Sequence, residues 1–545
     1  MLIDFNQNPD TELNCDICIV GGGAAGAVLF DMLSKTKHKI LLIESGGLVP
    51  DGITQELNEG FHKLNGRQLG VDSPNPLSYR TRALGGTTGL WGGGIELFQE
   101  LDFTKRSWVK DSGWPISLTE LEAYYGEAKR YVEITADVFD ERMWGVLGMN
   151  PPYKFNFSEI STAFSVKSGY LVEPGYLNWP GPVNFRKYLI NSNVQKSDNV
   201  VLYNATLTNL KSDGNGTVQS GEVSNPKLQK RLLHAKVYIL AAGGLENPRI
   251  MLNANNGVGI GNETDCVGRY YLAHPHGRPA DLICNSKLIS TELSWKLQYY
   301  KVGNNRAEPL FEWKEATQRR YNLLSSSVRL VPDYDTDSAV YKAMRIRELI
   351  SSGSLKSKDV SFSDVARVLS EIDDVLVNAY RKWANQGVHA RMMEKIPLAY
   401  IQEGTPKRHS RIYLSNERDK MGQRKLILDW YFDDQEIQNM YKVLKLFAAT
   451  ARDLGWGRIQ LRQDAEEKSH NPSRGLLEAA HPSGATRMSD VKNRGVVDRN
   501  LRVHSSKNLY VCGSSVFPTN SWVSPTFTIV ALAARLAAHL KTHQI

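Results

Sequence analysis

A glycine-rich segment near the amino terminus has the residue types and spacing of a dinucleotide-binding turn. Gly21, Gly23 and Gly26 form G-x-G-x-x-G between an apolar run, 16–20, and a segment of helical composition, 27–34. In a strand–turn–helix setting the first glycine allows the tight turn, the second admits a pyrophosphate to the backbone, and the third lets helix and strand pack closely. The diphosphate would bind the unpaired amides at the start of the helix.

An acidic residue follows this turn at the separation expected for a ribose contact. Residues 39–43 are predicted to form the second strand, and Glu44 ends it, about 20 residues after the turn. A carboxylate at this place can accept hydrogen bonds from an adenosine ribose and disfavours a 2'-phosphate. The turn and the acid together leave NAD and FAD equally open.

One histidine stands in a setting suited to proton transfer. His481 lies between Ala480 and Pro482, where the proline and Gly484 predict a loop rather than a periodic apolar face. An imidazole with an ordinary pKa of about 6.5 can take a hydroxyl proton at neutral pH. From the residues alone, however, a structural or merely exposed histidine is the commoner case.

The cysteines do not indicate a metal site or a disulfide framework. The chain has five cysteines, scattered along its length. Cys15 and Cys18 form C-x-x-C, but they lie in an alternating, β-branched run that is typical of a strand. As small buried side chains they need no ligand, so we expect no bound metal.

A second glycine-rich segment predicts a backbone that approaches a flat ligand. Six of the ten residues in 85–94 are glycines, and Trp91 stands among them. Side chains are absent where a backbone must come close to a ligand, and a plain surface loop would not explain the tryptophan.

Two further apolar runs, 237–242 and 509–513, lead into glycines and read as buried parallel strands. Ligands bind at the carboxyl ends of such strands. Ser524 and Pro525 then open an apolar helix, 527–540, as cap and first helical residue. The dipole of that helix could stabilise negative charge on a reduced cofactor.

Composition and charge limit the class of protein. The chain has 545 residues, of which 41% are hydrophobic and 23% charged, and its formal net charge is +8. These values are typical of a soluble globular protein. Its basic residues form no cluster with interleaved aromatics, so we expect no nucleic acid partner. No leader is evident at the amino terminus, and the segment 527–540 is too short and contains Arg535, which predicts no membrane span and a cytoplasmic protein.

Taken together, the motifs resemble those of the glucose–methanol–choline (GMC) oxidoreductases. The spacing and the Thr-Thr-x-x-Trp block are most similar to the sugar-oxidising branch, the pyranose oxidases and the fructose and gluconate dehydrogenases. The blocks span nearly the whole chain in the order of the family: 16–47, 84–93, 113–116, 124–125, 241–244, 268–270, 481–488, 495–498 and 513–518. The resemblance implies an α/β fold, with a Rossmann-like FAD-binding domain and a second α+β substrate domain built on an antiparallel sheet.

The resemblance also implies which residues bind the cofactor. Some sugar oxidases of the family tether FAD through a histidine just before the tryptophan, but Leu90 stands there, so we expect non-covalent FAD. The expected cofactor-binding residues are Gly21, Gly23, Ala24, Ala25, Gly26, Glu44, Ser45, Gly85, Gly86, Thr87, Thr88, Leu90, Trp91, Gly92, Gly93, Ala242, Gly243, Gly513, Ser514, Pro525 and Thr526.

In the family pattern His481 is the general base, so the resemblance makes it the expected catalytic residue. The sequence departs from that pattern at Ser524, where a second histidine or an asparagine is usual. A serine hydroxyl can donate one hydrogen bond to a substrate oxygen, or it can be used as a helix cap. Asn520 and Trp522 could supply a polar partner and an aromatic platform for a sugar, or could be packing residues.

The expected function is FAD-dependent oxidation of an alcohol, on a sugar or glycoside, by hydride transfer to flavin N5 with His481 as base. Oxygen, a quinone or a partner redox protein would accept the electrons, and the chain could form oligomers. Two alternatives stay open. One is a hydroxynitrile-lyase-like enzyme on the same scaffold, and the other is a non-catalytic flavin-binding subunit.

The domain division follows from the change in pattern along the chain. We assign 1–155, 195–283 and 471–545 to the FAD-binding domain, and 156–194 and 284–470 to the substrate-binding domain. In the latter, 411–414 and 426–432 predict an antiparallel hairpin, and Asp433 with Glu436 predicts a capping box before a core-packed helix. The amphipathic segment 359–383 is interpreted as another core helix, with a lid or an oligomer contact as alternatives.

Overall fold

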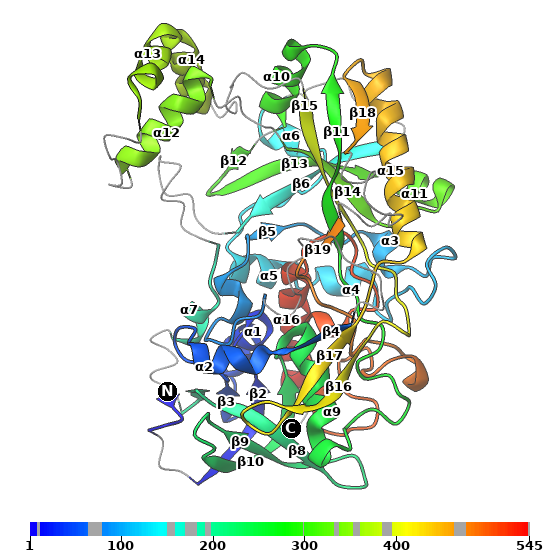
Figure 1. Ribbon diagram of the computed structural model, residues 1–545. Helices are drawn as coiled ribbons and strands as arrows, with labels where there is room; N and C mark the ends of the chain where they lie inside the picture. The colour runs from blue at the N-terminus through cyan, green and yellow to red at the C-terminus, as the bar shows by residue number, and fades with distance from the viewer. Residues whose placement is uncertain are drawn as a thin grey trace.

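The chain folds around two large β-sheets, one in the lower and one in the upper half of the computed structural model (Figure 1). Both chain ends lie in the lower half. The structure describes residues 1–7, 11–63, 79–149, 159–168, 182–190, 198–297, 299–331, 337–351, 360–383, 395–462 and 476–542.

The lower sheet is largely parallel, as the sequence predicts. Its strand order is β1 (Leu2–Asp4), β7 (Val200–Tyr203), β3 (Ile40–Ile43), β2 (Glu12–Val20), β10 (Lys230–Leu240), β9 (Val218–Ser224) and β8 (Thr206–Ser212), with β20 (Leu509–Val511) also paired to β10. Val20, Ile43 and Leu240 are in register at the carboxyl ends of three parallel strands. The glycine turns that follow β2 and β10 therefore meet at one edge of the sheet.

Two helices beside this sheet are buried on nearly all sides. α1 (Ala24–Leu33) and α16 (Thr526–Thr542) pack against each other, and Phe30 and Phe527 have no exposed surface. Both helices are apolar around most of their circumference, which is the pattern of a helix in the interior. α1 begins directly at the first glycine turn, so the amides at its start face the cofactor region.

The upper sheet is antiparallel. Its strand order is β18 (Gly457–Leu461), β11 (Pro275–Cys284), β15 (Lys395–Gln402), β14 (Ser326–Leu330), β13 (Asn305–Trp313), β6 (Ile160–Lys167) and β5 (Gly94–Ile95), with β12 (Tyr300–Val302) paired to β13 and β19 (Leu476–Glu478) paired to β11. Strands from three distant parts of the chain thus share this sheet. β11 begins directly after His274, and β19 ends three residues before His481.

The predicted capping box and its helix are confirmed. The Asp433 carboxylate accepts the Glu436 N–H at 2.9 Å, and Glu436 accepts the Asp433 N–H at 2.8 Å. α15 (Asp434–Asp453) then buries Met440, Leu444 and Phe447 in the core beside the upper sheet.

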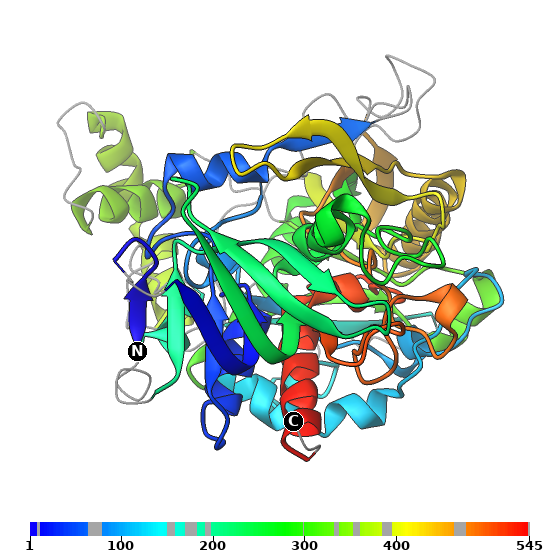
Figure 2. The ribbon, with the colours of Figure 1, turned by 90° about the horizontal axis from the view of Figure 1, so that it is seen from below.

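The predicted hairpin forms, but in a separate small sheet. β16 (Arg411–Arg418) and β17 (Arg424–Asp429) pair with each other, and β17 pairs with β4 (Gly60–Lys63). They pack on α9 (Gly243–Gly257) beside the lower sheet (Figure 2). The domain division stays a prediction: its limits near 155, 195 and 470 lie outside the described residues, and 283 is the penultimate residue of strand β11.

The interpretation of 359–383 as a core helix is wrong for the residues described there. The segment forms two helices, α13 (Phe362–Ser370) and α14 (Ile372–Trp383), which stand with α12 (Ala339–Ser351) clear of both sheets (Figure 1). Phe362 is 90% exposed and Leu369 is 65% exposed. Helical periodicity shows that a helix has an apolar face, but it does not show whether another element covers that face. Residue 359 lies outside the described residues.

The remaining helices are short or lie at the edges. They are α2 (Gly52–Gln55), α3 (Glu100–Phe103), α4 (Leu118–Glu122), α5 (Tyr125–Val132), α6 (Met143–Val146), α7 (Arg186–Leu189), α10 (Lys287–Lys296) and α11 (Glu315–Tyr321). Within the described part of the chain, none of the helices combines the length and apolar character needed to cross a membrane.

Candidate active site

One cavity of about 1610 Å³ joins the two sheets. It exceeds the roughly 300–1,000 Å³ of an ordinary small-molecule site, as an elongated dinucleotide together with a substrate requires. Most predicted residues line it: Gly21, Gly23, Ala24, Ala25, Glu44, Ser45, Gly86, Thr87, Thr88, Leu90, Trp91, Gly92, Gly93, Ala242, Gly243, His481, Gly513, Ser514, Trp522, Ser524, Pro525 and Thr526. Gly26, Gly85 and Asn520 do not line it. Each of them instead contacts residues behind the cavity wall.

The first glycine turn fits a pyrophosphate. Gly21 has φ +107°, and a Cβ there would lie 2.7 Å from the Ala241 carbonyl oxygen. A Cβ on Gly26 would collide with the Gly21 carbonyl oxygen, which explains why Gly26 packs inside the turn rather than against the cavity. A Cβ on Gly23 would meet nothing within 4 Å. The backbone of Gly23 is therefore open to the cavity at the amino terminus of α1, where an anion is favoured.

The acid at the end of β3 is held by the turn itself. Glu44 accepts the Gly22 N–H at 2.7 Å and the Gly46 N–H at 2.9 Å, one with each carboxylate oxygen. Burial raises the pKa of Glu44, and these hydrogen bonds partly oppose that effect. Each oxygen keeps a second lone pair, so a ribose contact is still open to this carboxylate.

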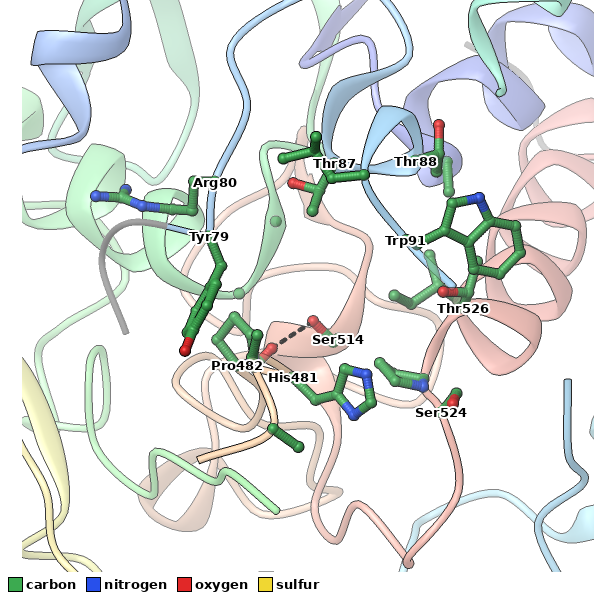
Figure 3. A pocket seen from close by; sticks show the side chains of 18 of the residues that line it. Tyr79, Arg80, Thr87, Thr88, Trp91, His481, Pro482, Ser514, Ser524 and Thr526 are labelled. Atoms are coloured by element: carbon green, nitrogen blue, oxygen red, sulfur yellow. Dashed lines mark hydrogen bonds between the residues drawn. The ribbon is translucent and has the colours of Figure 1, made fainter. Parts of the chain in front are cut away.

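The second glycine segment docks onto the first. The Gly85 N–H donates to the Gly22 carbonyl at 2.9 Å, and a Cβ on Gly86 would lie 3.0 Å from the Cα of Gly23. Trp91 is anchored by a 3.0 Å hydrogen bond from its indole nitrogen to the Val183 carbonyl. The two segments thus form one wall of the cavity, and Thr87 and Trp91 face His481 across it (Figure 3).

His481 lies at the opposite wall and is paired with a second histidine. Its Nδ1 is 2.9 Å from Nδ1 of His274, and the two rings stand at 83° to each other. Burial lowers the pKa of His481 to about 4, with a smaller contribution from His276. His274 is fully buried, while His276 lines the cavity and its Nδ1 is 3.1 Å from the Leu477 carbonyl.

The sequence interpretation missed these two histidines. His274, Pro275 and His276 enter β11, and the His-Pro pair repeats the local pattern of His481 and Pro482. That repetition was the one available signal, because nothing local shows that residues so far apart in the chain touch.

Some of the residues before α16 line the cavity, and others are buried behind its wall. Ser524 and Trp522 line the cavity, and the Ser524 N–H donates to the Glu96 carboxylate at 3.1 Å. No hydrogen bond of the Ser524 hydroxyl is found among the described residues, so the predicted cap contact is not seen there. Asn520 is buried behind the cavity, where its side-chain oxygen accepts the Gly404 N–H at 3.0 Å. It is therefore not placed to contact a substrate directly.

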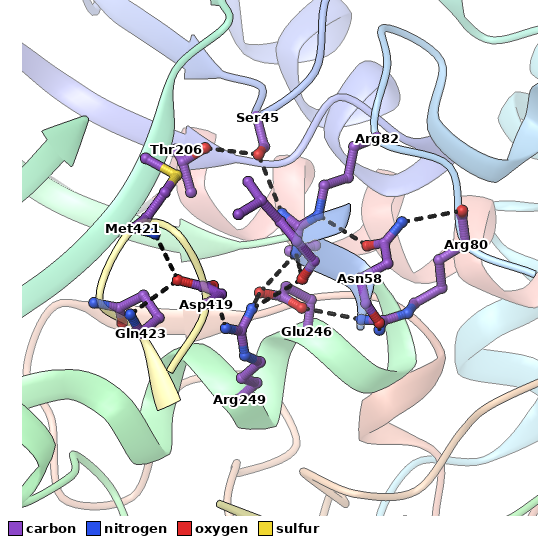
Figure 4. Close-up of polar contacts among 12 residues, drawn as sticks. Ser45, Asn58, Arg80, Arg82, Thr206, Glu246, Arg249, Asp419, Met421 and Gln423 are labelled. Atoms are coloured by element: carbon purple, nitrogen blue, oxygen red, sulfur yellow. Dashed lines mark hydrogen bonds and ion pairs between the residues drawn. The ribbon is translucent and has the colours of Figure 1, made fainter. Parts of the chain in front are cut away.

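A buried arginine cluster at the other end of the cavity was also missed. Glu246 accepts ion pairs from Arg80 at 3.1 Å, Arg82 at 3.0 Å and Arg249 at 2.9 Å (Figure 4). These arginines hold the pKa of the Glu246 carboxyl far below its ordinary value. Arg82 also donates to the Ser45 hydroxyl at 3.1 Å, so the cluster orders the residues next to Glu44.

Comparison with known proteins agrees with the resemblance that the sequence predicts. The GMC oxidoreductase family model matches residues 406–533, which include His481, Ser524 and the start of α16. The chain is similar to the GMC oxidoreductases, as the sequence predicts, and it matches their carboxyl-terminal family model over these residues. It is therefore an oxidoreductase that acts on CH–OH groups with FAD as cofactor, and the predictions of family and enzyme class are confirmed.

Relatives match along nearly the whole length of the chain. The large subunit of fructose dehydrogenase from Gluconobacter japonicus is 21% identical, over 96% of this chain and 97% of the relative. Paromamine 6'-oxidase from Streptomyces fradiae is 23% identical, over 97% of this chain and 91% of the relative.

Solved structures confirm the predicted fold class. Pyridoxine 4-oxidase from Mesorbium loti superposes with a TM-score of 0.57 at 18% identity. The superposition covers 98% of this chain and 100% of the oxidase chain. Formate oxidase from Aspergillus oryzae RIB40 gives a TM-score of 0.55 at 15% identity, covering 98% and 99%. The chain thus has the fold that the sequence predicts, with a Rossmann-type region and a second region built on an antiparallel sheet.

Proposed function

We propose that this GMC protein oxidises a hydroxyl group of a sugar or glycoside, with His481 as the general base. The observation that carries the proposal is the single cavity that runs from the glycine turn to His481. The names of the relatives support the substrate class, since one is a fructose dehydrogenase and another acts on the aminoglycoside paromamine.

The chemistry follows from the state of the imidazole. FAD, when bound, supplies a hydride acceptor at N5. His481 takes the hydroxyl proton, the carbon-bound hydrogen leaves with its electron pair, and the product is a carbonyl compound. Because burial lowers the pKa of His481 to about 4, the ring is neutral and able to accept a proton at pH 7.

Ser524 and Trp522 are proposed to hold the substrate. The Ser524 hydroxyl opens to the cavity near His481 and can donate to the substrate oxygen (Figure 3). Trp522 is 6% exposed and lines the same wall, so its ring offers a rigid apolar surface for a sugar face. In this arrangement His481 attracts the proton of the hydroxyl while Ser524 orients its oxygen.

The cofactor is proposed to bind without a covalent link. Leu90 stands in the cavity wall beside Trp91, and its alkyl side chain offers no atom that could attach to the flavin ring. The site residues are those of the two glycine segments, Glu44 and the start of α16. Acid precipitation of the yellow protein should leave a colourless pellet and release FAD to the supernatant. A pellet that stays yellow would contradict this part of the proposal.

An anaerobic screen tests the function. The purified protein, loaded with FAD, is mixed with sugars, glycosides and simple alcohols while flavin absorbance is recorded, and the reduced protein is then exposed to air or to a quinone. Bleaching by a sugar or glycoside supports the proposal, and the reoxidation step identifies the acceptor. Aldehyde release from a cyanohydrin without bleaching would instead favour a lyase. Bound FAD that no alcohol reduces would favour a non-catalytic subunit.

A further inference from the structure

His274, the buried neighbour of His481, also forms a hydrogen bond with the backbone on the side away from His481. His274 Nε2 is 3.2 Å from the carbonyl oxygen of Asn520, and its Nδ1 is 2.9 Å from Nδ1 of His481. His274 has no exposed surface. Three groups therefore form a line from the backbone before α16 to the wall of the cavity: a carbonyl, a buried ring and the ring of His481.

The position of each proton along this line follows from the donors and acceptors. A carbonyl oxygen only accepts hydrogen bonds, so the Nε2 atom of His274 carries a proton. Burial in this site favours neutral His274, with its pKa well below the ordinary value, and a neutral imidazole carries one proton. The Nδ1 atom of His274 is then a bare acceptor. The facing Nδ1 atom of His481 must carry a proton and donate it.

We infer that His274 is a positioning residue, which fixes His481 in the tautomer that has Nδ1 protonated and Nε2 bare toward the cavity. This inference rests on the proposed role of His481 as base. Nε2 is the nitrogen that would take the hydroxyl proton. After it does so, His481 still donates from Nδ1 to His274, so the same hydrogen bond orients the ring in both protonation states.

The other titratable groups near the pair do not replace this contact. The Nδ1 atom of His276 is 3.1 Å from the Leu477 carbonyl, which leaves its Nε2 bare as well. The Glu478 carboxylate lies close, but it accepts the backbone N–H of His481, at 3.3 Å, rather than a ring proton. Among the described residues, His274 is the hydrogen-bond partner that the structure shows for the imidazole of His481.

Two substitutions of His274 separate positioning from packing. His274→Asp keeps an acceptor for the His481 Nδ1 proton, although it places a carboxylate in a buried site. His274→Phe keeps the ring volume but removes the acceptor. If His274 only fills space, the phenylalanine variant should be the more active. If it positions His481, His274→Phe should lose about 10- to 100-fold in the rate of flavin reduction, as is usual when an orienting partner is removed, and His274→Asp should retain more activity.

The aspartate variant should also move the pH profile. An ionised carboxylate next to His481 favours the imidazolium and raises the pKa of His481. The base is then protonated up to a higher pH, so the acid limb of the rate of flavin reduction should move upward from about pH 4, where the pKa of His481 lies in the parent protein. His409→Asp, an exposed position outside the cavity, adds the same charge and should leave the profile unchanged.

A measurement without turnover decides the tautomer. The FAD-loaded protein is labelled with ¹⁵N-histidine, and the His481 signals are identified as those lost in His481→Gln. Their ring-nitrogen shifts should show a protonated Nδ1 and a bare Nε2 at neutral pH. The reverse assignment would overturn the inference, whether or not the His274 variants fold.

The two proposals can fail separately. If no alcohol bleaches the flavin but the spectrum shows Nδ1 protonated, the proposed function fails and the positioning by His274 stands. If bleaching depends on His481 but Nε2 carries the proton, the function stands and His274 has only a structural place.

Discussion

At the scale of single residues, the proposed base is a neutral imidazole, and the proposed cofactor cradle is made mainly of backbone. Most imidazole bases in enzymes are paired with a carboxylate, which raises their pKa. His481 instead contacts a buried, neutral ring, and burial keeps its pKa low. The His481 ring is therefore neutral over a wide range of pH, but its low pKa also makes it a weaker base.

Removing the base tests its role directly. His481→Ala should reduce the rate of flavin reduction by about 10²- to 10⁴-fold, the usual contribution of a general base. FAD should still bind, because the glycine turns proposed to hold it are separate from the loop of His481. The measurement is anaerobic stopped-flow absorbance, with the FAD-to-protein ratio as control. Unchanged bleaching would exclude His481 from the chemistry.

The pH dependence has a definite sign. As the proposed base, His481 can accept a proton only when neutral, so flavin reduction should be nearly constant around neutral pH and should fall as the pH drops through about 4, the pKa of His481. An acid limb centred near the ordinary histidine pKa would contradict the burial argument. Far-ultraviolet circular dichroism at each pH would separate this loss from acid unfolding.

At the scale of elements, the proposed cofactor site is formed by strand β2, the glycine turn after it and the first turn of helix α1. β2 ends at Val20 and α1 begins at Ala24, so the amides of the first helical turn face the cavity. The second glycine segment closes this wall through Gly85 and Gly86. The two segments need glycine for different reasons. A Cβ at Gly23 would meet no protein atom within 4 Å, whereas a Cβ at Gly86 would lie 3.0 Å from the Cα of Gly23. A substitution at Gly23 can therefore test cofactor binding without disturbing the contact between the segments.

Gly23→Ala should leave the fold intact and weaken FAD binding. A Cβ at Gly23 meets nothing within 4 Å in the protein, but it points into the space proposed for the pyrophosphate. Gly126→Ala is the matched control, since its Cβ also meets nothing within 4 Å and it lies in α5, outside the cavity. Thermal unfolding should be similar for both, while FAD affinity should fall at least about tenfold, or about 1.4 kcal/mol, only for Gly23→Ala.

At the scale of the whole molecule, a buried ion pair joins the segment after α3 to the upper sheet. Arg106 donates two hydrogen bonds to Glu403, at 2.5 and 2.7 Å, and both side chains have no exposed surface. Arg106 follows α3, whereas Glu403 follows β15 of the upper sheet. A pair of this kind is costly to bury and costly to break, so it specifies how the parts dock more than it adds stability.

Breaking this pair should therefore destabilise the protein strongly. Glu403→Gln removes the carboxylate that pairs with the buried Arg106 guanidinium and leaves only the charge of Asp102 near it, so the free energy of unfolding should fall by about 3–5 kcal/mol. The exposed pair of Arg142 and Asp140 is the control, and Asp140→Asn should change it by less than about 1 kcal/mol. Denaturant unfolding measures both, and equal effects would contradict the argument.

Stability should also fall as the pH rises through neutrality. Burial raises the pKa of Glu312 in β13 from 4.5 to about 8. A carboxyl whose pKa is raised by folding contributes stability at low pH, and this contribution is lost as the pH increases to about 8. Glu312→Gln should flatten the decline, whereas Glu315→Gln on the surface should not. Melting temperatures across this range measure the effect.

Local sequence determined the parts of this protein that depend on neighbouring residues. The glycine turn, the strands around it, the capping box of α15 and the loop of His481 are all set by a few consecutive side chains. They need only the conformational freedom of glycine, the alternation of strands and the hydrogen bonds of a helix end. Most of the site residues predicted from the sequence therefore line the cavity, and the same motifs carry the resemblance to the family.

Tertiary structure alone decided which distant residues meet. His274 and His481 are 207 positions apart, and Glu246 lies 166 positions from Arg80. Whether the apolar face of α13 is covered likewise depends on what the rest of the chain places beside it, and its apolar residues stay exposed. Such contacts are fixed by the packing of sheets and helices against each other. A pattern within one segment carries no information about the partner that packing will bring to it.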